Sequence, residues 1–302
     1  MTELVIEVAQ LVKTFGTFRA LDGLDLQVRA GEVHGFLGPN GAGKSTTLRV
    51  LLGLYRATSG QVRVLGLDPA RHAADVTRRS AYVPGDVALW PSLTGQEVLD
   101  ALAGLRGGAD KARQARLVDA FALDPAKKVR AYSKGNRQKV ALIAAFSAPA
   151  SLIVLDEPTA GLDPLMEETF QACVRDAAAR GQTVLLSSHV LSEVDRICDS
   201  VTIIKDGRTV EHGRLSDLRH LAASHVTATV PEHAIEAVRR WLAGTAGLSG
   251  GCDPAGRAEV QAAEGAVPVV LQGLLDAGAA QISCTPATLD DLFLRHYAAA
   301  AR

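Results

Sequence analysis

Residues 38–45 read Gly38-Pro39-Asn40-Gly41-Ala42-Gly43-Lys44-Ser45, which fits the phosphate-loop pattern G-x-x-x-x-G-K-[ST]. The apolar run 33–37 before this loop predicts a strand, and a helical pattern begins at Lys44. Glycines let backbone N–H groups converge on phosphate oxygens, and a helix N-terminus adds partial positive charge. We therefore expect residues 38–45 and Thr46 to bind a nucleotide, with Lys44 at its phosphates and the Ser45 hydroxyl on Mg²⁺.

An α/β core is predicted around this loop. Apolar and polar residues alternate over 4–8 and 24–29, as they do in half-buried strands. Further strands are predicted at 61–64, 80–83, 151–155 and 183–186, and a hairpin with an Asp-Gly turn at 201–210. Strands that alternate with helices indicate an α/β fold, which binds ligands at the carboxyl ends of its strands.

The segment 94–149 has a mainly helical pattern, and we interpret it as a helical insertion within this domain. Thr94 is its predicted N-cap, and Glu97 three residues later completes a capping box. A further helix is predicted to begin at Pro164 and to end at Gly181.

Polar residues with catalytic potential follow two of the predicted strands. Asp156 and Glu157 come directly after the run 151–155. In phosphate-loop enzymes an aspartate at such a strand end holds Mg²⁺, and a neighbouring carboxylate can orient or deprotonate a water molecule. His189 follows the strand at 183–187, where it could reach the terminal phosphate. Each residue alone also has a structural interpretation, but the phosphate loop in the same chain favours the catalytic one.

A further motif indicates the family. The segment Tyr132-Ser133-Lys134-Gly135-Asn136-Arg137-Gln138 resembles the signature loop, usually written LSGGQ, of ABC transporter ATP-binding subunits. With the loop 38–45 and the acidic pair, it makes residues 4–213 similar to that family. The resemblance implies an ABC ATPase core with a helical signature subdomain, and ATP and Mg²⁺ as cofactors.

The same resemblance implies roles for particular residues and partners. Ser133 and Gly135 cap the ATP bound by the opposite subunit of a dimer, Phe15 stacks on adenine, and Asp163 belongs to the D-loop that couples the two sites. The implied partners are a second ATPase subunit, which we take to be another copy of this chain, and an integral-membrane permease on a separate chain.

Two features depart from the family pattern. Lys134 stands at the usual first glycine of the signature, and Asn136 at the usual glutamine. Gly85 stands where the family has a glutamine that touches Mg²⁺ and the attacking water. Asp86 is a candidate substitute, and we assign no residue to this role.

The pattern changes after residue 217, so we divide the chain into an ATP-binding domain, 1–217, and an accessory domain, 218–302. The order βαββαβ, with a glycine-rich gap at 244–256 and a last helix after Thr288, suggests a small α+β, ferredoxin-like domain. The signature loop, the missing glutamine and the tail 288–294 are together similar to drug-export ATPases of the daunorubicin-resistance (ABC-2) type.

Composition narrows the class further. The 302 residues carry a formal net charge of −1, without the basic balance typical of nucleic-acid binding. Four scattered cysteines form no zinc or redox motif, and no signal peptide or apolar run of ~18 residues is visible. We expect a cytoplasmic protein, peripheral on the inner face of the cell membrane. The alternative is a soluble ABC ATPase without a transport role, although the chain has neither the heptads nor the second cassette of such proteins.

Overall fold

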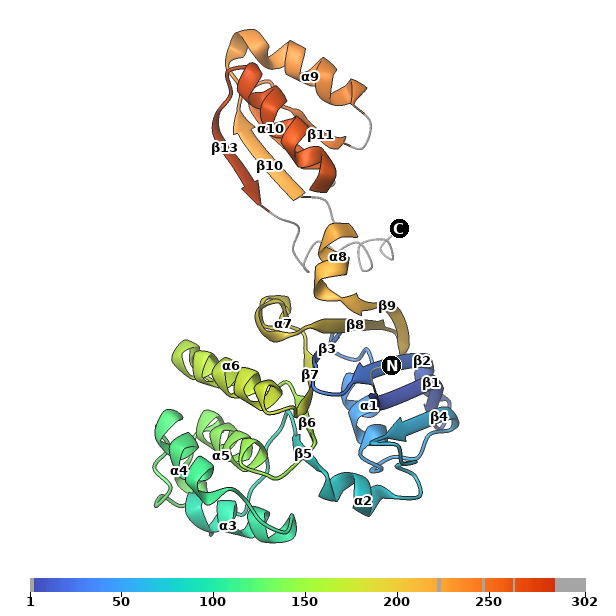
Figure 1. The fold of residues 1–302 in the computed structure, drawn as a ribbon, viewed down its shortest axis with the longest axis vertical. Helices are drawn as coiled ribbons and strands as arrows, with labels where there is room; N and C mark the ends of the chain where they lie inside the picture. Colours follow the sequence, from blue (N-terminus) through green and yellow to red (C-terminus); the bar gives the residue numbers. More distant parts are fainter. Residues whose placement is uncertain (1–2, 222–223, 246–247, 263, 286–302) are drawn as a thin grey trace. The chain divides into compact units, whose positions relative to one another are not determined.

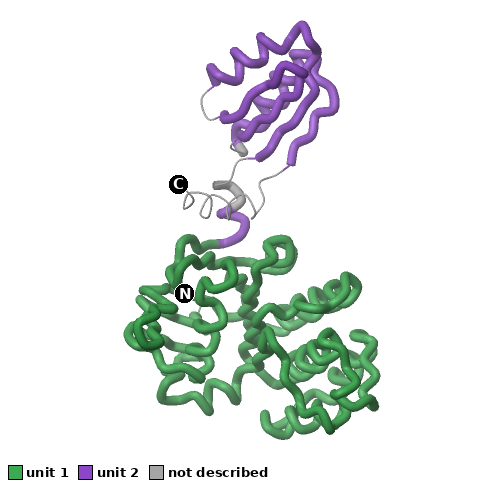
Figure 2. The backbone as a smooth tube through the Cα atoms, turned by 180° about the vertical axis from the view of Figure 1, so that it is seen from behind, with its two compact units in different colours: residues 1–213 green, residues 214–302 purple. Residues whose placement is uncertain are grey.

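The computed structural model describes residues 3–221, 224–245, 248–262 and 264–285 of the chain. The chain divides into two compact units, residues 1–213 and 214–302, which Figure 2 shows in different colours. The division falls at the end of strand β9 (Arg208–Arg214), whereas the sequence analysis draws it between residues 217 and 218.

The centre of the first unit is a six-stranded sheet in the order β5-β6-β7-β3-β8-β9 (Figure 1). Besides β9 it contains β3 (Val33–Leu37), β5 (Ser80–Val83), β6 (Leu152–Asp156), β7 (Thr183–Ser188) and β8 (Ser200–Lys205). The neighbours from β5 to β8 pair in parallel. Every residue of β3, β6 and β7 is buried, which is the pattern of central strands in a parallel sheet covered on both faces.

A smaller antiparallel sheet, in the order β2-β1-β4, lies beside the first one. Its strands are β1 (Leu4–Phe15), β2 (Phe18–Arg29) and β4 (Ser59–Val64). Helix α1 (Lys44–Leu51) contributes Leu48 and Leu51 to a buried core that also contains Leu24 of β2 and Val154 of β6. Because this core draws on both sheets, the start of α1 is fixed relative to both.

The remaining helices of this unit pack against strands β3, β5 and β7 or against one another. They are α2 (Ala73–Arg78), α3 (Gly95–Leu105), α4 (Lys111–Ala120), the short η1 (Val129–Ala131), α5 (Lys134–Phe146), α6 (Pro164–Ala179) and α7 (Leu191–Ile197). The predicted capping box at the start of α3 is confirmed, since Thr94 and Glu97 exchange both hydrogen bonds. Phe146 of α5 packs against Phe170 of α6, with ring centroids 6.2 Å apart.

The second unit begins with α8 (Leu215–Leu221) and continues as a four-stranded antiparallel sheet with helices. Its elements are β10 (Ser224–Thr229), η2 (Glu232–Ala234), α9 (Ile235–Gly244), β11 (Leu248–Cys252), β12 (Arg257–Ala262), η3 (Glu264–Ala266), α10 (Val267–Asp276) and β13 (Ala280–Thr285). The element order βαββαβ and the strand order β11-β12-β10-β13 are compatible with the ferredoxin-like arrangement that the sequence suggests.

Strand β11 lies in the glycine-rich gap 244–256, for which the sequence analysis named no strand. Gly250 has a φ of 131°, and a Cβ there would lie 2.1 Å from the Glu259 carbonyl oxygen of β12. Backbone approach of this kind replaces the apolar alternation that marks other strands. The predicted last helix and the tail 288–294 lie outside the described residues.

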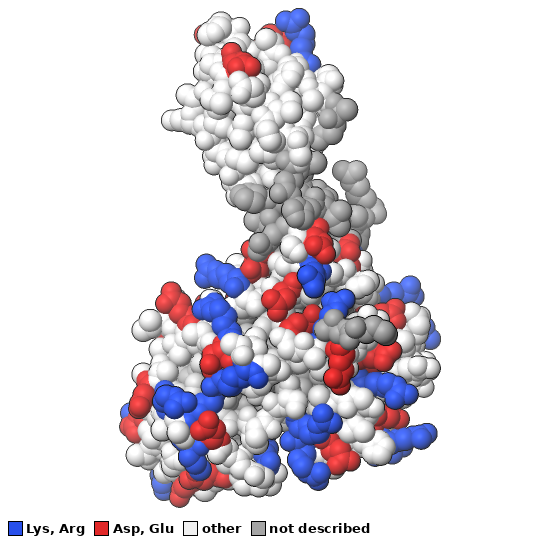
Figure 3. Space-filling model, in the orientation of Figure 1, with Lys and Arg blue, Asp and Glu red and all other residues white. Residues whose placement is uncertain are grey.

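Charged side chains are spread over the first unit. On the face that Figure 3 shows, lysines and arginines alternate with acidic residues and neither sign gathers into one large patch. Such a face does not produce the single-sign field that steers highly charged partners.

Loss of the capping box should destabilise the helical insertion. In Thr94→Ala, the N–H of Glu97 loses its acceptor at 3.2 Å, and we expect the thermal midpoint of the first unit to fall by about 2–4 °C. Glu97→Gln should lose less, because glutamine also serves in this box. Thr17→Ala, at an exposed turn, is the control for differential scanning calorimetry. An unchanged midpoint for Thr94→Ala would contradict a stabilising role of the cap.

Candidate active site

The loop 38–45 is held by close backbone contacts that two of its glycines permit. A Cβ on Gly38 would lie 2.6 Å from the Ile204 carbonyl oxygen. Gly43 is the N-cap of α1, with φ 107°, and a Cβ there would lie 2.6 Å from the Leu21 side chain. No side chain caps α1, and its first turn carries no acidic residue. The N–H groups at this helix start are therefore oriented for an external anion.

The turn of the β8–β9 hairpin is hydrogen-bonded to this loop. Asp206 and Gly207 have φ values of 50° and 74°, so the Asp-Gly turn predicted from the sequence is confirmed. The N–H of Gly207 donates to the Ala42 carbonyl at 3.1 Å, and its own carbonyl accepts from the N–H of Asp22 at 2.9 Å. Arg208 and Arg19 both pair with the Asp22 carboxylate, which lowers the pKa of Asp22.

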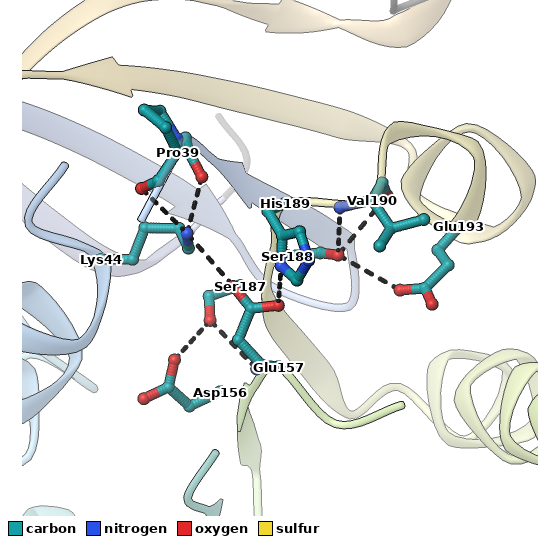
Figure 4. Close-up of polar contacts among 10 residues, drawn as sticks. Pro39, Lys44, Asp156, Glu157, Ser187, Ser188, His189, Val190 and Glu193 are labelled. Carbon is teal, nitrogen blue, oxygen red and sulfur yellow. Dashed lines mark hydrogen bonds and ion pairs between the residues drawn. The ribbon is translucent and has the colours of Figure 1, made fainter. Parts of the chain in front are cut away.

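Lys44 joins the loop to the end of strand β6. Its side chain is 6% exposed, and Nζ donates to the carbonyls of Gly38 at 2.6 Å and Pro39 at 3.3 Å. The same Nζ lies 3.1 Å from Glu157 Oε1 (Figure 4). A buried ammonium group is thus stabilised by two carbonyl dipoles and one carboxylate.

Asp156 ends β6 and is 3% exposed. The Ser187 hydroxyl, from the end of β7, donates to Asp156 Oδ1 at 2.7 Å. Burial, together with the negative charge of Asp156, raises the pKa of the nearby Tyr82 to about 12. The sequence analysis did not assign Ser187. Its signal was a hydroxyl at the end of an otherwise apolar buried strand, next to the strand that carries Asp156.

Glu157 is the centre of the polar cluster. Its φ of 49° places a residue other than glycine in the left-handed region, where backbone strain is typical of functional sites. Its N–H is held by the Ser187 carbonyl at 3.1 Å and faces the Ser187 hydroxyl at 3.3 Å. Its second oxygen, Oε2, lies 2.6 Å from Nδ1 of His189, whose side chain is 53% exposed. The structure therefore brings the three predicted residues Lys44, Glu157 and His189 together.

The signature segment bonds to its own surroundings and lies apart from this cluster. Ser133 caps α5 by accepting the N–H of Asn136 at 3.2 Å. A Cβ on Gly135 would lie 2.5 Å from the Gly161 carbonyl, and Gln138 Nε2 donates to the Pro158 carbonyl at 2.9 Å. Among the described residues, no hydrogen bond or ion pair joins Ser133 or Gly135 to the loop 38–45.

Two other predicted residues lie at the margins of the site. Asp163 caps α6 by accepting the N–H of Met166 at 3.0 Å. Phe15 is 43% exposed and packs edge-on against Tyr55 with ring centroids 5.4 Å apart, while Lys13 Nζ lies 4.8 Å from its ring. Phe15 therefore presents an accessible aromatic surface.

Gly85 lies against the acidic pair. A Cβ there would be 3.2 Å from the Asp156 carbonyl and 3.7 Å from Glu157 Cβ. The position is thus next to the site but supplies no side chain. Asp86 beside it is exposed.

Together, a parallel sheet, a phosphate loop after β3 and an acidic pair after β6 define a phosphate-loop nucleotide hydrolase. A family model described as "ABC transporter" matches residues 21–160. The chain is 38% identical over 226 residues to "Daunorubicin/doxorubicin resistance ATP-binding protein DrrA" of Streptomyces peucetius, covering 73% of this chain and 68% of that protein. It is 33% identical to "Bacitracin transport ATP-binding protein BcrA" of Bacillus licheniformis, covering 68% and 69%.

A solved structure described as "Structure of ATP binding subunit of ABC transporter" superposes with a TM-score of 0.67 at 32% identity, covering 72% of this chain and 92% of that one. The chain belongs to the ABC transporter family and is an ABC-type ATPase. No helix within the described ranges has the length and apolar character needed to cross a membrane.

The space around Gly38 can be tested directly. In Gly38→Ala the new methyl group must displace the Ile204 carbonyl or the loop, and we expect nucleotide affinity to fall roughly tenfold or more. Gly104→Ala is the matched control, because a Cβ on Gly104 meets no atom within 4 Å. Titration with a fluorescent ATP analogue measures both. Equal affinities would show that the loop does not depend on this close approach.

Proposed function

We propose that this chain powers the export of drug-like or lipid-like molecules through a permease on a separate chain. The observation that carries the ATP-hydrolysing part of this proposal is the Glu157 carboxylate, which lies between Lys44 and His189 at the end of the sheet where the phosphate loop begins. The names of the similar proteins, which refer to daunorubicin resistance and bacitracin transport, support an export role.

The chemistry would proceed at the γ-phosphate of ATP. Lys44 and the N–H groups of the loop would hold the phosphates, with Phe15 against the adenine ring. Glu157 would accept a proton from the attacking water as the water oxygen bonds to the γ-phosphorus and the bond from that phosphorus to the bridging oxygen breaks, so that ADP leaves with the bridging oxygen. His189, which bonds to Glu157 Oε2, would orient that carboxylate and stabilise the charge on the γ-phosphoryl group.

A Mg²⁺ site fits the residues present. Mg²⁺ in nucleotide sites takes one or two protein oxygens and completes its shell with phosphate oxygens and water. The Asp156 carboxylate, oriented by Ser187, and the Ser45 hydroxyl at the start of α1 are donors of this type. When bound there, the ion would neutralise charge that develops on the phosphates.

The signature segment would act on a second subunit. Ser133 and Gly135 sit at the N-terminus of α5, and among the described residues neither bonds to the phosphate loop of its own subunit. We propose that they close over the γ-phosphate held by another copy of this chain. The contact of Gly135 with Gly161 would link that movement to the loop that contains Asp163.

A groove on the first unit is the proposed docking site for the permease, on the cytoplasmic side of the membrane. It encloses about 420 Å³ between the ends of α1 and α3 and helix α2. Leu54 and Leu105, which line this groove, are 60% and 77% exposed. Apolar surface of this kind suits an apolar segment of a membrane partner.

Substitution of the proposed base provides the first test. Glu157→Gln keeps the shape of the side chain but removes its proton acceptor, and we expect kcat for ATP hydrolysis to fall by about 10²–10⁴. ATP should then hold the dimer closed, and a complex purified from the host's membranes with Mg-ATP should contain an integral membrane protein. Lys44→Ala, which would remove the proposed phosphate contact, is the control that should not form the ATP-dependent dimer.

This experiment tests ATP hydrolysis and association with a membrane permease separately. A closed dimer found only in the soluble fraction would favour a soluble ABC ATPase, while the ATP chemistry would stand. Unchanged turnover in Glu157→Gln would instead remove Glu157 from the reaction.

The docking groove makes an independent prediction. Leu105→Asp places a charge on a residue that is 77% exposed at the groove, so basal ATPase activity should stay within about twofold while membrane association is lost. Val269→Asp, which changes an apolar residue of α10 that is 54% exposed, is the control. Co-sedimentation with membranes from the host measures both variants. If Leu105→Asp still sedimented with membranes, the groove would not be the docking site.

A further inference from the structure

A buried carboxylate lies behind the loop that carries His189. Glu193 on α7 is 9% exposed and belongs to none of the motifs that define the nucleotide site. The Ser188 hydroxyl donates to Glu193 Oε2 at 3.2 Å and accepts the N–H of Val190 at 2.9 Å (Figure 4). Ser188 and Val190 are the two residues that flank His189. Glu193 therefore bonds to Ser188 directly and is linked to the Val190 backbone through the Ser188 hydroxyl.

The same carboxyl group lies close to the segment that follows Glu157. Burial raises the pKa of Glu193, and the Thr159 side chain, two residues after Glu157, is close enough to oppose that rise. Glu193 is thus bonded to the loop that carries His189 and lies near the segment that carries Glu157. These two segments carry the two ends of the 2.6 Å contact between His189 Nδ1 and Glu157 Oε2.

Burial of the Glu193 carboxylate is unfavourable in free energy, so an acid would not be expected here if the side chain only filled space. Desolvation raises the pKa of Glu193, and the negative charges of Glu167 and Glu157 act in the same direction. Its neighbour Val194 is fully buried and apolar, so the helix already packs through aliphatic side chains. A buried acid is stable only where hydrogen bonds compensate it, and the hydrogen bond from Ser188 ties Glu193 to the loop that carries His189.

His189 needs such an anchor. Its side chain is 53% exposed, so packing restricts its orientation little. Fixing the backbone at Ser188 and Val190 restricts where the imidazole ring can lie. In a catalytic contact, a displacement of about 1 Å can reduce the rate by about 10²-fold.

We propose that Glu193 is a positioning residue for ATP hydrolysis, which holds the His189 side chain against Glu157 through Ser188. This inference rests on the proposed function, in which Glu157 activates the attacking water. Glu193 touches neither the nucleotide loop nor Asp156 in the bonds described, so its effect should fall on turnover and leave ATP binding unchanged.

The test is a double-mutant cycle on the purified full chain. Glu193→Ala should lower kcat about tenfold or more while KM for ATP stays within about twofold. In a His189→Ala background, Glu193→Ala should cause little further loss, because the residue it positions is already absent. Glu168→Ala, an exposed acid on α6, is the control and should match the wild type.

Two variants keep the test valid if Glu193→Ala does not fold. Glu193→Gln retains an acceptor for the Ser188 hydroxyl and should keep about a third or more of kcat. Ser188→Ala removes the link itself and should reproduce the loss seen with Glu193→Ala, again without effect in the His189→Ala background.

Other outcomes overturn the inference. Equal losses with and without His189 would show that Glu193 acts through general stability. A raised KM with unchanged kcat would place its effect on binding, and wild-type turnover in Glu193→Ala would remove any role. A wild-type chain that does not hydrolyse ATP would overturn the proposed function together with this inference, whereas an active wild type with an active Glu193→Ala would overturn this inference alone.

Discussion

The parallel pairing of β3, β6 and β7 is the constraint on which the rest of the first unit depends. Its register aligns Leu37 with Ser188 and Asp156 with Ser187, so three loops leave the sheet at one edge. The phosphate loop, the acidic pair and His189 are far apart in the sequence but meet there. A slip of one residue would turn every side chain of a strand to the other face, and Asp156 would lose its pairing with Ser187.

The residues at this edge include a buried charge and a strained backbone, both of which the surrounding hydrogen bonds stabilise. Lys44 is a buried cation, and Glu157 adopts a left-handed backbone that costs about 1 kcal/mol or more in a residue other than glycine. Lys44 is bonded to two carbonyls and to Glu157, and the Glu157 N–H is held by Ser187. The bonds to Lys44 offset the cost of its buried charge, and the bond from Ser187 holds the strained backbone of Glu157, at the edge where ATP chemistry is proposed to occur.

The positions that depart from the family pattern are those where the structure leaves room for a different side chain, or for none. Gly135, which is retained, has no room for a Cβ beside the Gly161 carbonyl, whereas Lys134 is exposed and its aliphatic stem lies over Gly161. A Cβ on Gly85 would lie 3.2 Å from the Asp156 carbonyl oxygen and 3.7 Å from Glu157 Cβ. The glycine that stands in place of the family's glutamine therefore changes the chemistry available at the acidic pair more than the packing there. The signature can thus change at Lys134 while the contact between the two loops is kept.

The sequence by itself determined the features that depend on near neighbours in the chain. These are the phosphate loop, the buried strands, the capping box at Thr94 and the Asp-Gly turn, because each follows from local spacing and backbone preference. Only the tertiary structure decided that Ser187 orients Asp156, that Glu193 anchors the His189 loop, and that the glycine-rich stretch pairs as β11. Those contacts join neighbouring strands and helices whose register no local pattern encodes, and a single chain without its relatives carries no other signal for them.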